Sequence, residues 1–195
     1  MKIRYRLSFL LFSILCLNAD GQDFNASVIA GINASRTREL GVNFNKLGMS
    51  VGLAASRQLA TDFFGEIQVL YNQKGQLNQP DSAGIIHGNL SLEYAEMALR
   101  FGYAFSSMMR AGIGASYGKL IRNSEIIDGV HYKYGPDQIN RTDISLQIFV
   151  LYRLFERFTG EFIYIHQINM LRNIWDFESN STVGIRVSYT FLGGK

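Results

Sequence analysis

The chain has 195 residues, of which 47% are apolar and 18% are charged, whereas an average soluble domain is about a quarter charged. Glycine (19 residues), phenylalanine (14) and tyrosine (10) are abundant, and proline occurs only twice. This composition excludes a disordered chain, a collagen-like chain and a coiled coil. Because glycine and the aromatic residues are poor helix formers and aromatics favour strands, it predicts an all-β fold.

Residues 1–21 have the pattern of a secretory signal peptide. Three cations stand among the first six residues, the apolar run LSFLLFSILCLNA follows, and small residues come next. We expect cleavage near residues 19–22, either after Ala19 or, preferably, after Gly21. About 174 of the 195 residues would remain, and that length predicts a single domain, 22–195.

Removal of this leader would also remove Cys16, the only cysteine of the chain. The mature chain would then have no disulfide and no cysteine-based metal site. A lipid anchor on Cys16 is not expected either, because Leu15 precedes it where a small residue is needed. The leader carries three cations and one acid, so 16 cations against 15 acids are left, a net charge of +1. This small charge gives no argument for nucleic-acid binding.

The mature chain alternates apolar residues with small or polar ones in eight segments. In the clearest segment, residues 47–59, every second residue is apolar except Arg57. A period of two is that of a β-strand with one apolar face. Each segment is close to the 9–11 residues, roughly, that a tilted strand needs to cross a bilayer. The other segments begin at residues 24, 63, 95, 109, 144, 158 and 183.

The expected connections alternate strictly between long and short. The long ones cover 34–46, 75–89, 122–141 and 169–180, and the short ones cover 60–62, 106–108 and 155–157. Outer-membrane barrels show this pattern, with tight periplasmic turns, long outer loops and both termini in the periplasm. The sequence therefore predicts an all-β, eight-stranded, antiparallel up-and-down transmembrane β-barrel in the outer membrane of a Gram-negative bacterium, with both termini periplasmic.

The two faces of the predicted strands differ in chemistry. The apolar face carries aromatic residues near the strand ends, as expected at the two membrane–water interfaces. The other face combines Gly and Ser with Arg, Glu and Gln, which suits a narrow lumen in which charges pair. Eight strands enclose an interior about one side chain wide, so a diffusion pore is not expected. The candidate lumen charge network consists of Glu66, Glu96, Glu161, Arg100, Arg110, Arg153 and Arg186.

Two roles are open for this network: a structural plug that fills space and fixes strand register, or a gate that opens a narrow polar path when pairs exchange. If the apolar face instead points inward, the chain is a soluble lipocalin-like barrel that binds an apolar ligand. Alternation alone does not distinguish a barrel whose apolar face points outward from one whose apolar face points inward, since both have the same period of two. The chemistry of the polar face favours the membrane barrel.

No catalytic residue, cofactor or metal site is predicted. Outer-membrane lipid deacylases place His and Ser two residues apart on an outward strand, but here Ile168 occupies the position of the nucleophile after His166. The remaining histidines, His87 and His131, fall in separate loops without metal-ligand spacing. We therefore expect a protein that is not an enzyme.

The long loops are the remaining functional surface, since loops on a rigid barrel commonly carry its function. Apolar side chains at loop tips contact partners, fold back over the barrel mouth or touch the lipid surface. The expected partners are outer-membrane lipid, the barrel assembly machinery during biogenesis, and a protein bound at the extracellular loops. The candidate loop contacts are Tyr132, Tyr134, Trp175 and Phe177.

The final segment VGIRVSYTF, which ends in Tyr189 and Phe191, resembles the C-terminal assembly signal of outer-membrane barrels, although four residues follow it. The segments AGINAS, LGMSVGLAASRQLATDFFGEIQVLYNQKG, LEYAEMALRFGYAF and RAGIGASYGKLI resemble the PorT-type outer-membrane β-barrel family common in Bacteroidota, within the wider group of OmpA/OmpX-like small barrels. Ala98 departs from that family, whose members often have proline there. The resemblance implies an eight-stranded barrel without catalytic residues, and the founding member is linked to protein secretion and maturation at the cell surface.

Overall fold

The computed structural model describes residues 24–37, 46–77, 88–127, 130–133, 140–169 and 179–193. The predicted signal peptide lies outside these residues. Within them, no helix is long and apolar enough to cross a membrane. The strands are β1 (Phe24–Thr37), β2 (Lys46–Gln58), β3 (Phe63–Leu77), β4 (Gly88–Ala104), β5 (Met109–Ile127), β6 (Val130–Tyr132), β7 (Thr142–Arg153), β8 (Phe158–Gln167) and β9 (Asn180–Leu192).

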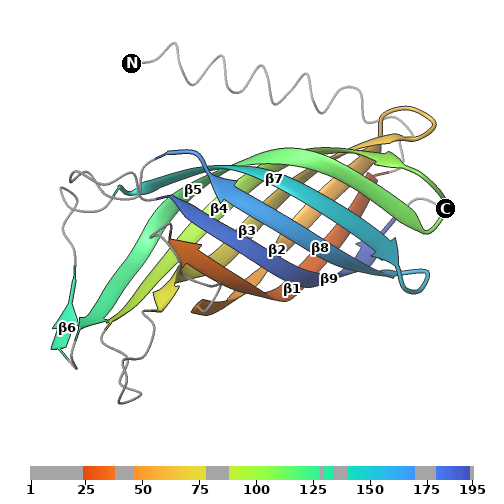
Figure 1. The fold of residues 1–195 in the computed structure, drawn as a ribbon. Helices are drawn as coiled ribbons and strands as arrows, with labels where there is room; N and C mark the ends of the chain where they lie inside the picture. The colour runs from red at the N-terminus through yellow and green to blue at the C-terminus, as the bar shows by residue number, and fades with distance from the viewer. Residues whose placement is uncertain are drawn as a thin grey trace, which may run out of the picture.

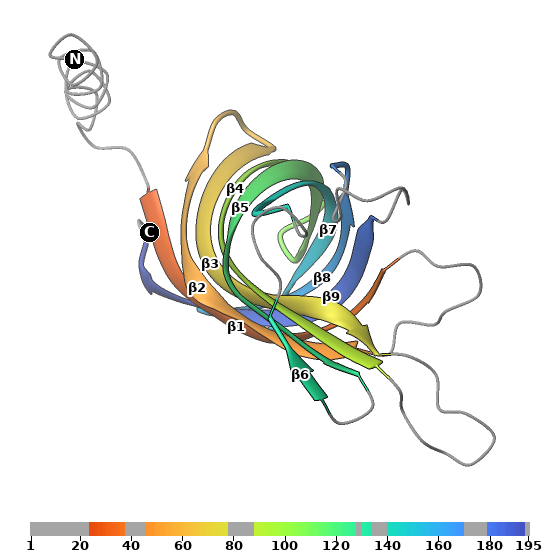
Figure 2. The same ribbon diagram turned by 90° about the vertical axis from the view of Figure 1, so that its left-hand side faces the viewer.

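Eight of these strands form a closed antiparallel barrel (Figure 1). Each pairs with its neighbours in the sequence, and β1 pairs with β9 from Ala26↔Leu192 to Thr37↔Asn180. Figure 2 shows the resulting ring of strands. Closure matters because it gives every strand a partner on both sides and leaves the barrel wall without an open edge. The short strand β6 is outside this ring and pairs with β5. The predicted fold class is confirmed.

Tight turns gather at one end of the barrel, which we call the turn end; the opposite end is the loop end. Each turn is closed by a backbone hydrogen bond, in which Leu59, Phe105 and Leu154 donate to the carbonyls of Phe63, Met109 and Phe158 at 2.8, 3.0 and 2.9 Å. The turns therefore lie where the sequence predicts them. The described chain also begins and ends here, since β1 starts and β9 finishes at the turn end.

Several strands extend further toward the loop end than predicted. The hairpin of β4 and β5 continues to the pair Gly88↔Ile127, inside the expected loops 75–89 and 122–141. On β4 the sequence signal changes there because Leu92 and Tyr94 point into the barrel, whereas the apolar residues that follow point outward. On β5 the register shifts at Ile121, the extra residue between the partners of Glu93 and Tyr94. Such a β-bulge exchanges the faces of the strand that follows, so a regular period of two is lost.

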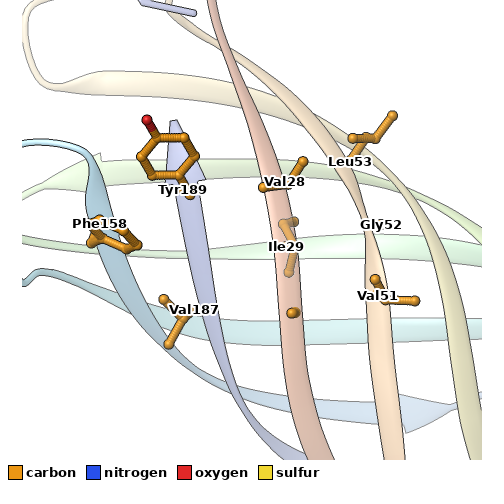
Figure 3. Close-up of a pocket in the computed structure, with 9 residues that line it drawn as sticks. Val28, Ile29, Val51, Gly52, Leu53, Phe158, Val187 and Tyr189 are labelled. Carbon is orange, nitrogen blue, oxygen red and sulfur yellow. The ribbon is translucent and has the colours of Figure 1, made fainter. Parts of the chain in front are cut away.

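The outer wall of the barrel is apolar. Side chains such as Ile113, Val69 and Met97 are exposed by 66, 59 and 58%, whereas their neighbours along the strand point inward. Figure 3 shows a shallow outer depression of about 630 Å³ over β2, β1, β9 and β8, lined largely by outward aliphatic side chains and by Phe158 and Tyr189. A surface of this kind is unfavourable in water and suits contact with hydrocarbon.

Aromatic side chains gather on the outer wall near the turn end, as the sequence predicts. The ring centroids of Phe63 and Tyr103 are 5.1 Å apart, and those of Tyr103 and Phe105 are 5.2 Å apart. On the other side of the barrel, Phe158 and Tyr189 lie 5.0 Å apart. Amphipathic rings at one level around the wall are typical of a membrane–water interface.

Candidate functional site: the barrel lumen

The lumen contains many buried polar and charged side chains beside three small apolar clusters, around Phe149, Leu92 and Leu70. Arg100, Arg186 and Lys74 are among the largest side chains that are almost completely buried. Burial of an unpaired charge costs several kcal/mol (about 3–5 when a buried pair is broken), so these cations need partners inside the barrel. The partners are arranged in two layers, one toward each end.

The loop-side charge layer consists of Lys74 on β3, Glu96 on β4 and Asp143 on β7. Lys74 Nζ lies 2.5 Å from a Glu96 oxygen and 2.9 Å from an Asp143 oxygen. All three side chains are only 1% exposed. Ser145 donates a hydrogen bond to Asp143, and the Tyr94 ring lies 5.5 Å from Lys74 Nζ. The ammonium group thus joins strands on opposite parts of the barrel wall.

A chain of side-chain hydrogen bonds from Glu96 extends this layer across β3, β2 and β1. Asn72 donates to Glu96 at 3.1 Å, and it accepts hydrogen bonds from Asn33 at 2.8 Å and from Ser50 at 2.7 Å. Because a one-residue slip of any strand would turn its inward side chain outward, this network fixes the register of four neighbouring strands.

The turn-side charge layer consists of Glu66, Arg100, Glu161 and Arg186. Arg100 Nη1 lies 3.3 Å from Glu66 and 3.1 Å from Glu161, and Arg186 Nη1 lies 3.7 Å from the same Glu161 oxygen. Gln68 donates to Glu66 at 2.8 Å. The Arg100 guanidinium also lies 3.6 Å from the centroid of the Phe149 ring. Two cations and two anions therefore neutralise one another within the layer.

A polar pocket of about 360 Å³ lies between this layer and the turn end. We call it the turn-end pocket. Its charged lining comprises Arg110, Arg153, Glu156 and the inner carboxylates Glu66 and Glu161. Arg110 lies over the Phe64 ring at 5.0 Å. Its uncharged polar lining comprises Asn25, Ser27, Ser56, Gln68, Thr159, Ser188 and Thr190.

The seven charged residues proposed from the sequence all lie on the inner face of the barrel, but not in one network. Four of them make the turn-side layer. Arg110 and Arg153 line the turn-end pocket, and within the described residues no carboxylate lies within ion-pair distance of either. Glu96 belongs to the other layer, where it pairs with Lys74 rather than with an arginine.

Sequence reasoning missed Lys74, Asp143 and Asn72. The predicted third strand ends at Tyr71 and the predicted seventh begins at Ile144, because the apolar residues of the alternation stop there, so these three residues fall outside the predicted strands. The available signal was continued alternation: Gln68, Asn72 and Lys74 share the inward parity of one strand, as do Asp143, Ser145 and Gln147 on another.

Among the loop candidates, Tyr132 is exposed on β6. Tyr134, Trp175 and Phe177 lie outside the described residues, as does His87. His131 is exposed on β6 as well.

His166 has a hydroxyl neighbour that the sequence did not reveal. Its Nδ1 lies 3.0 Å from Ser181 Oγ, on the next strand. Ser181 is only 6% exposed and also receives a hydrogen bond from the Tyr164 hydroxyl at 3.4 Å. A histidine within hydrogen-bond distance of a hydroxyl can activate a nucleophile, but the Ser181 hydroxyl is largely covered here by the Tyr164 and His166 side chains.

A closed eight-stranded barrel with an apolar outer wall, tight turns at one end and a lumen filled by paired charges has the architecture of small outer-membrane proteins. No family model and no curated protein matches the sequence.

Solved structures do match. The attachment invasion locus protein Ail of Yersinia pestis is 15% identical over 86% of this chain and 98% of its own, with a TM-score of 0.54. Neisserial surface protein A is 16% identical over 86% and 97%, with a TM-score of 0.55. Ail in a phospholipid bilayer nanodisc is 12% identical over 86% and 99%, with a TM-score of 0.51. These likenesses establish the fold.

Proposed function

We propose that this protein is an outer-membrane β-barrel that acts, without catalysis, as a structural or interaction protein through its loop end. In this proposal the turn end and both termini face the periplasm, and the loop end faces outward. The observation that carries it is the polarity of the wall: buried ion pairs fill the lumen while large aliphatic side chains are exposed around the outside. In a bilayer the apolar outer wall contacts hydrocarbon, while the charged side chains stay paired inside the closed barrel.

The same observation argues against a soluble lipocalin-like barrel. Such a barrel needs an apolar interior to hold its ligand. The described lumen has apolar clusters, but Arg100, Arg186 and Lys74, each at most 1% exposed, lie among them and leave no continuous apolar cavity for a ligand. The outer wall would also place its aliphatic side chains in water.

The interaction role is supported by a hairpin that projects from the loop end. The last residue of β5 that pairs with β7 is Lys119, yet β5 continues to Ile127 and then pairs with β6 (Figure 1). At about 3.4 Å per residue, residues 121–127 add about 24 Å of strand beyond the last pair with β7. Exposed Ile121, Val130 and Tyr132 lie on this projection. Exposed apolar residues on a projecting hairpin favour contact with a partner.

Cysteine labelling on intact cells tests the orientation. The mature chain would contain no cysteine, so a single cysteine can be placed in Tyr132→Cys at the loop end or in Ser107→Cys at the turn end. A membrane-impermeant maleimide should label Tyr132→Cys on whole cells, and Ser107→Cys only after the outer membrane is permeabilised. The reverse pattern, or recovery of the protein in the soluble periplasmic fraction, would contradict the proposal.

Two alternatives share this orientation. A surface adhesin would use the same projecting hairpin. A narrow channel would begin at the turn-end pocket and would require both charge layers to separate. Stepwise conductance in planar bilayers that changes in Glu96→Ala would favour the channel.

The proposal also includes membership of the PorT-type family and an origin in Bacteroidota, on the basis of the sequence resemblance given above. A role in protein secretion would follow from that membership. It predicts that deletion of the gene leaves secreted surface proteins unprocessed, whereas a purely structural barrel leaves their processing unchanged.

A further inference from the structure

Two arginines in the turn-end pocket are left without carboxylate partners. Arg110 on β5 is paired in register with Leu151, so Arg153 is its diagonal neighbour on the inner face of β7. Diagonal neighbours have backbones only about 7–8 Å apart. In the part of the chain that the structure describes, no carboxylate oxygen lies within 4.0 Å of either guanidinium.

Two of the three carboxylates that line this pocket form ion pairs with arginines of the turn-side layer. Glu66 pairs with Arg100, and Glu161 pairs with both Arg100 and Arg186. Glu156, in the turn after β7, is the third acid of the lining. The pocket and the layer behind it thus hold four arginines against three glutamates, a net charge of +1. The excess positive charge resides on Arg110 and Arg153.

The rest of the lining suits an anion rather than an apolar ligand. Five of its residues carry hydroxyl groups: Ser27, Ser56, Thr159, Ser188 and Thr190. The Ser188 hydroxyl donates to the Thr159 carbonyl, and Ser27 and Thr190 bond to each other, so the donors available to a ligand are Ser56, Thr159 and one hydroxyl of that pair. The volume of about 360 Å³ exceeds that of a water molecule, roughly 30 Å³, many times. Guanidinium groups present several N–H donors in one plane and match the oxygens of phosphate in a bidentate manner.

We propose that the turn-end pocket binds a phosphate-type oxyanion between Arg110 and Arg153, with the surrounding hydroxyls as additional donors. Arg110 is held in place for this role by the Phe64 ring. The ligand enters from the turn end, since the paired charges of the turn-side layer close the pocket on its inner side. Free phosphate and a phosphoryl group on a larger soluble molecule present the same chemistry to these arginines.

Binding can be measured on the folded barrel in uncharged detergent micelles. We expect inorganic phosphate to bind to the wild type in calorimetric titration and to broaden its ³¹P resonance. The double variant Arg110→Gln, Arg153→Gln should weaken binding at least about tenfold, because charge-assisted hydrogen bonds are the stronger ones. Glu156→Gln should tighten it, because a competing negative charge is removed from the lining.

The matched control is Arg57→Gln. Arg57 lies outside the pocket, with its guanidinium 5.5 Å from the Phe24 ring. This variant therefore removes a positive charge but leaves Arg110 and Arg153 in place. Its affinity for phosphate should equal that of the wild type. Heat-modified gel migration confirms that each variant is folded before it is titrated.

Glycerol phosphate is the second probe, and it separates the two sources of the anion. Equal affinity for the two probes indicates a site for free phosphate, whereas tighter binding of glycerol phosphate indicates a phosphorylated molecule. Absence of binding by the folded wild type would overturn the proposal. So would an equal loss of affinity in Arg57→Gln and the double variant, because diffuse charge alone would then account for the binding.

Discussion

The two charge layers of the lumen use the same chemistry in opposite settings. In the loop-side layer, Lys74, Glu96 and Asp143 are sealed from solvent, one cation against two anions. In the turn-side layer, Glu66 is 14% exposed and the layer adjoins an open polar pocket. Sealed charges can act only on one another, so the first layer stabilises the strand register. Charges beside an open pocket can also meet a ligand.

The largest effect is expected when the sealed layer loses its cation. Lys74→Met leaves Glu96 and Asp143 buried together without a positive charge. Breaking a buried pair in this way costs about 3–5 kcal/mol, measured as the loss of unfolding free energy in urea titration of the barrel in lipid vesicles. The triple variant Lys74→Met, Glu96→Gln, Asp143→Asn should recover most of this loss, because no charge stays unpaired. A triple variant as unstable as Lys74→Met would show that packing, not charge, dominates the layer.

A smaller effect is expected in the turn-side layer. Arg100→Met removes the central cation, but Glu161 keeps Arg186 as a partner and water from the pocket can reach Glu66. We expect a loss of about 2 kcal/mol in the same unfolding measurement. A loss equal to that of Lys74→Met would mean that the turn-side layer is as well sealed as the other, and the contrast between the layers would fail.

The difference between the layers also explains what could be predicted from the sequence. Alternation specifies which side chains face inward, so Glu66, Arg100, Glu161 and Arg186 were identified from parity alone. It does not specify how far adjacent strands are staggered, and stagger decides which inward charges share a level. Glu96 and Asp143 share a level because both are paired with Gly118 of β5, and the long Lys74 side chain reaches them from β3.

The loop end was less predictable for a related reason. Beyond the membrane-spanning part of the barrel, neither face of a strand has to be apolar, so β5 continues without a hydrophobic signal. The bulge opposite Glu93 further disrupts the period there. The projecting hairpin and β6 therefore appear only in the structure, although the sequence predicts Tyr132 as a loop contact.

The smallest effect on stability is expected at Arg153. This side chain is exposed at the mouth of the turn-end pocket, and no described carboxylate pairs with it. Arg153→Gln should therefore change the unfolding free energy by no more than about 0.5 kcal/mol, while it weakens phosphate binding. A substitution that is neutral for folding but harmful for binding separates a ligand-binding charge from a structural one. If Arg153→Gln instead destabilises the barrel as Arg100→Met does, Arg153 belongs to the structural layer. The pocket then has only Arg110 as a phosphate-binding arginine.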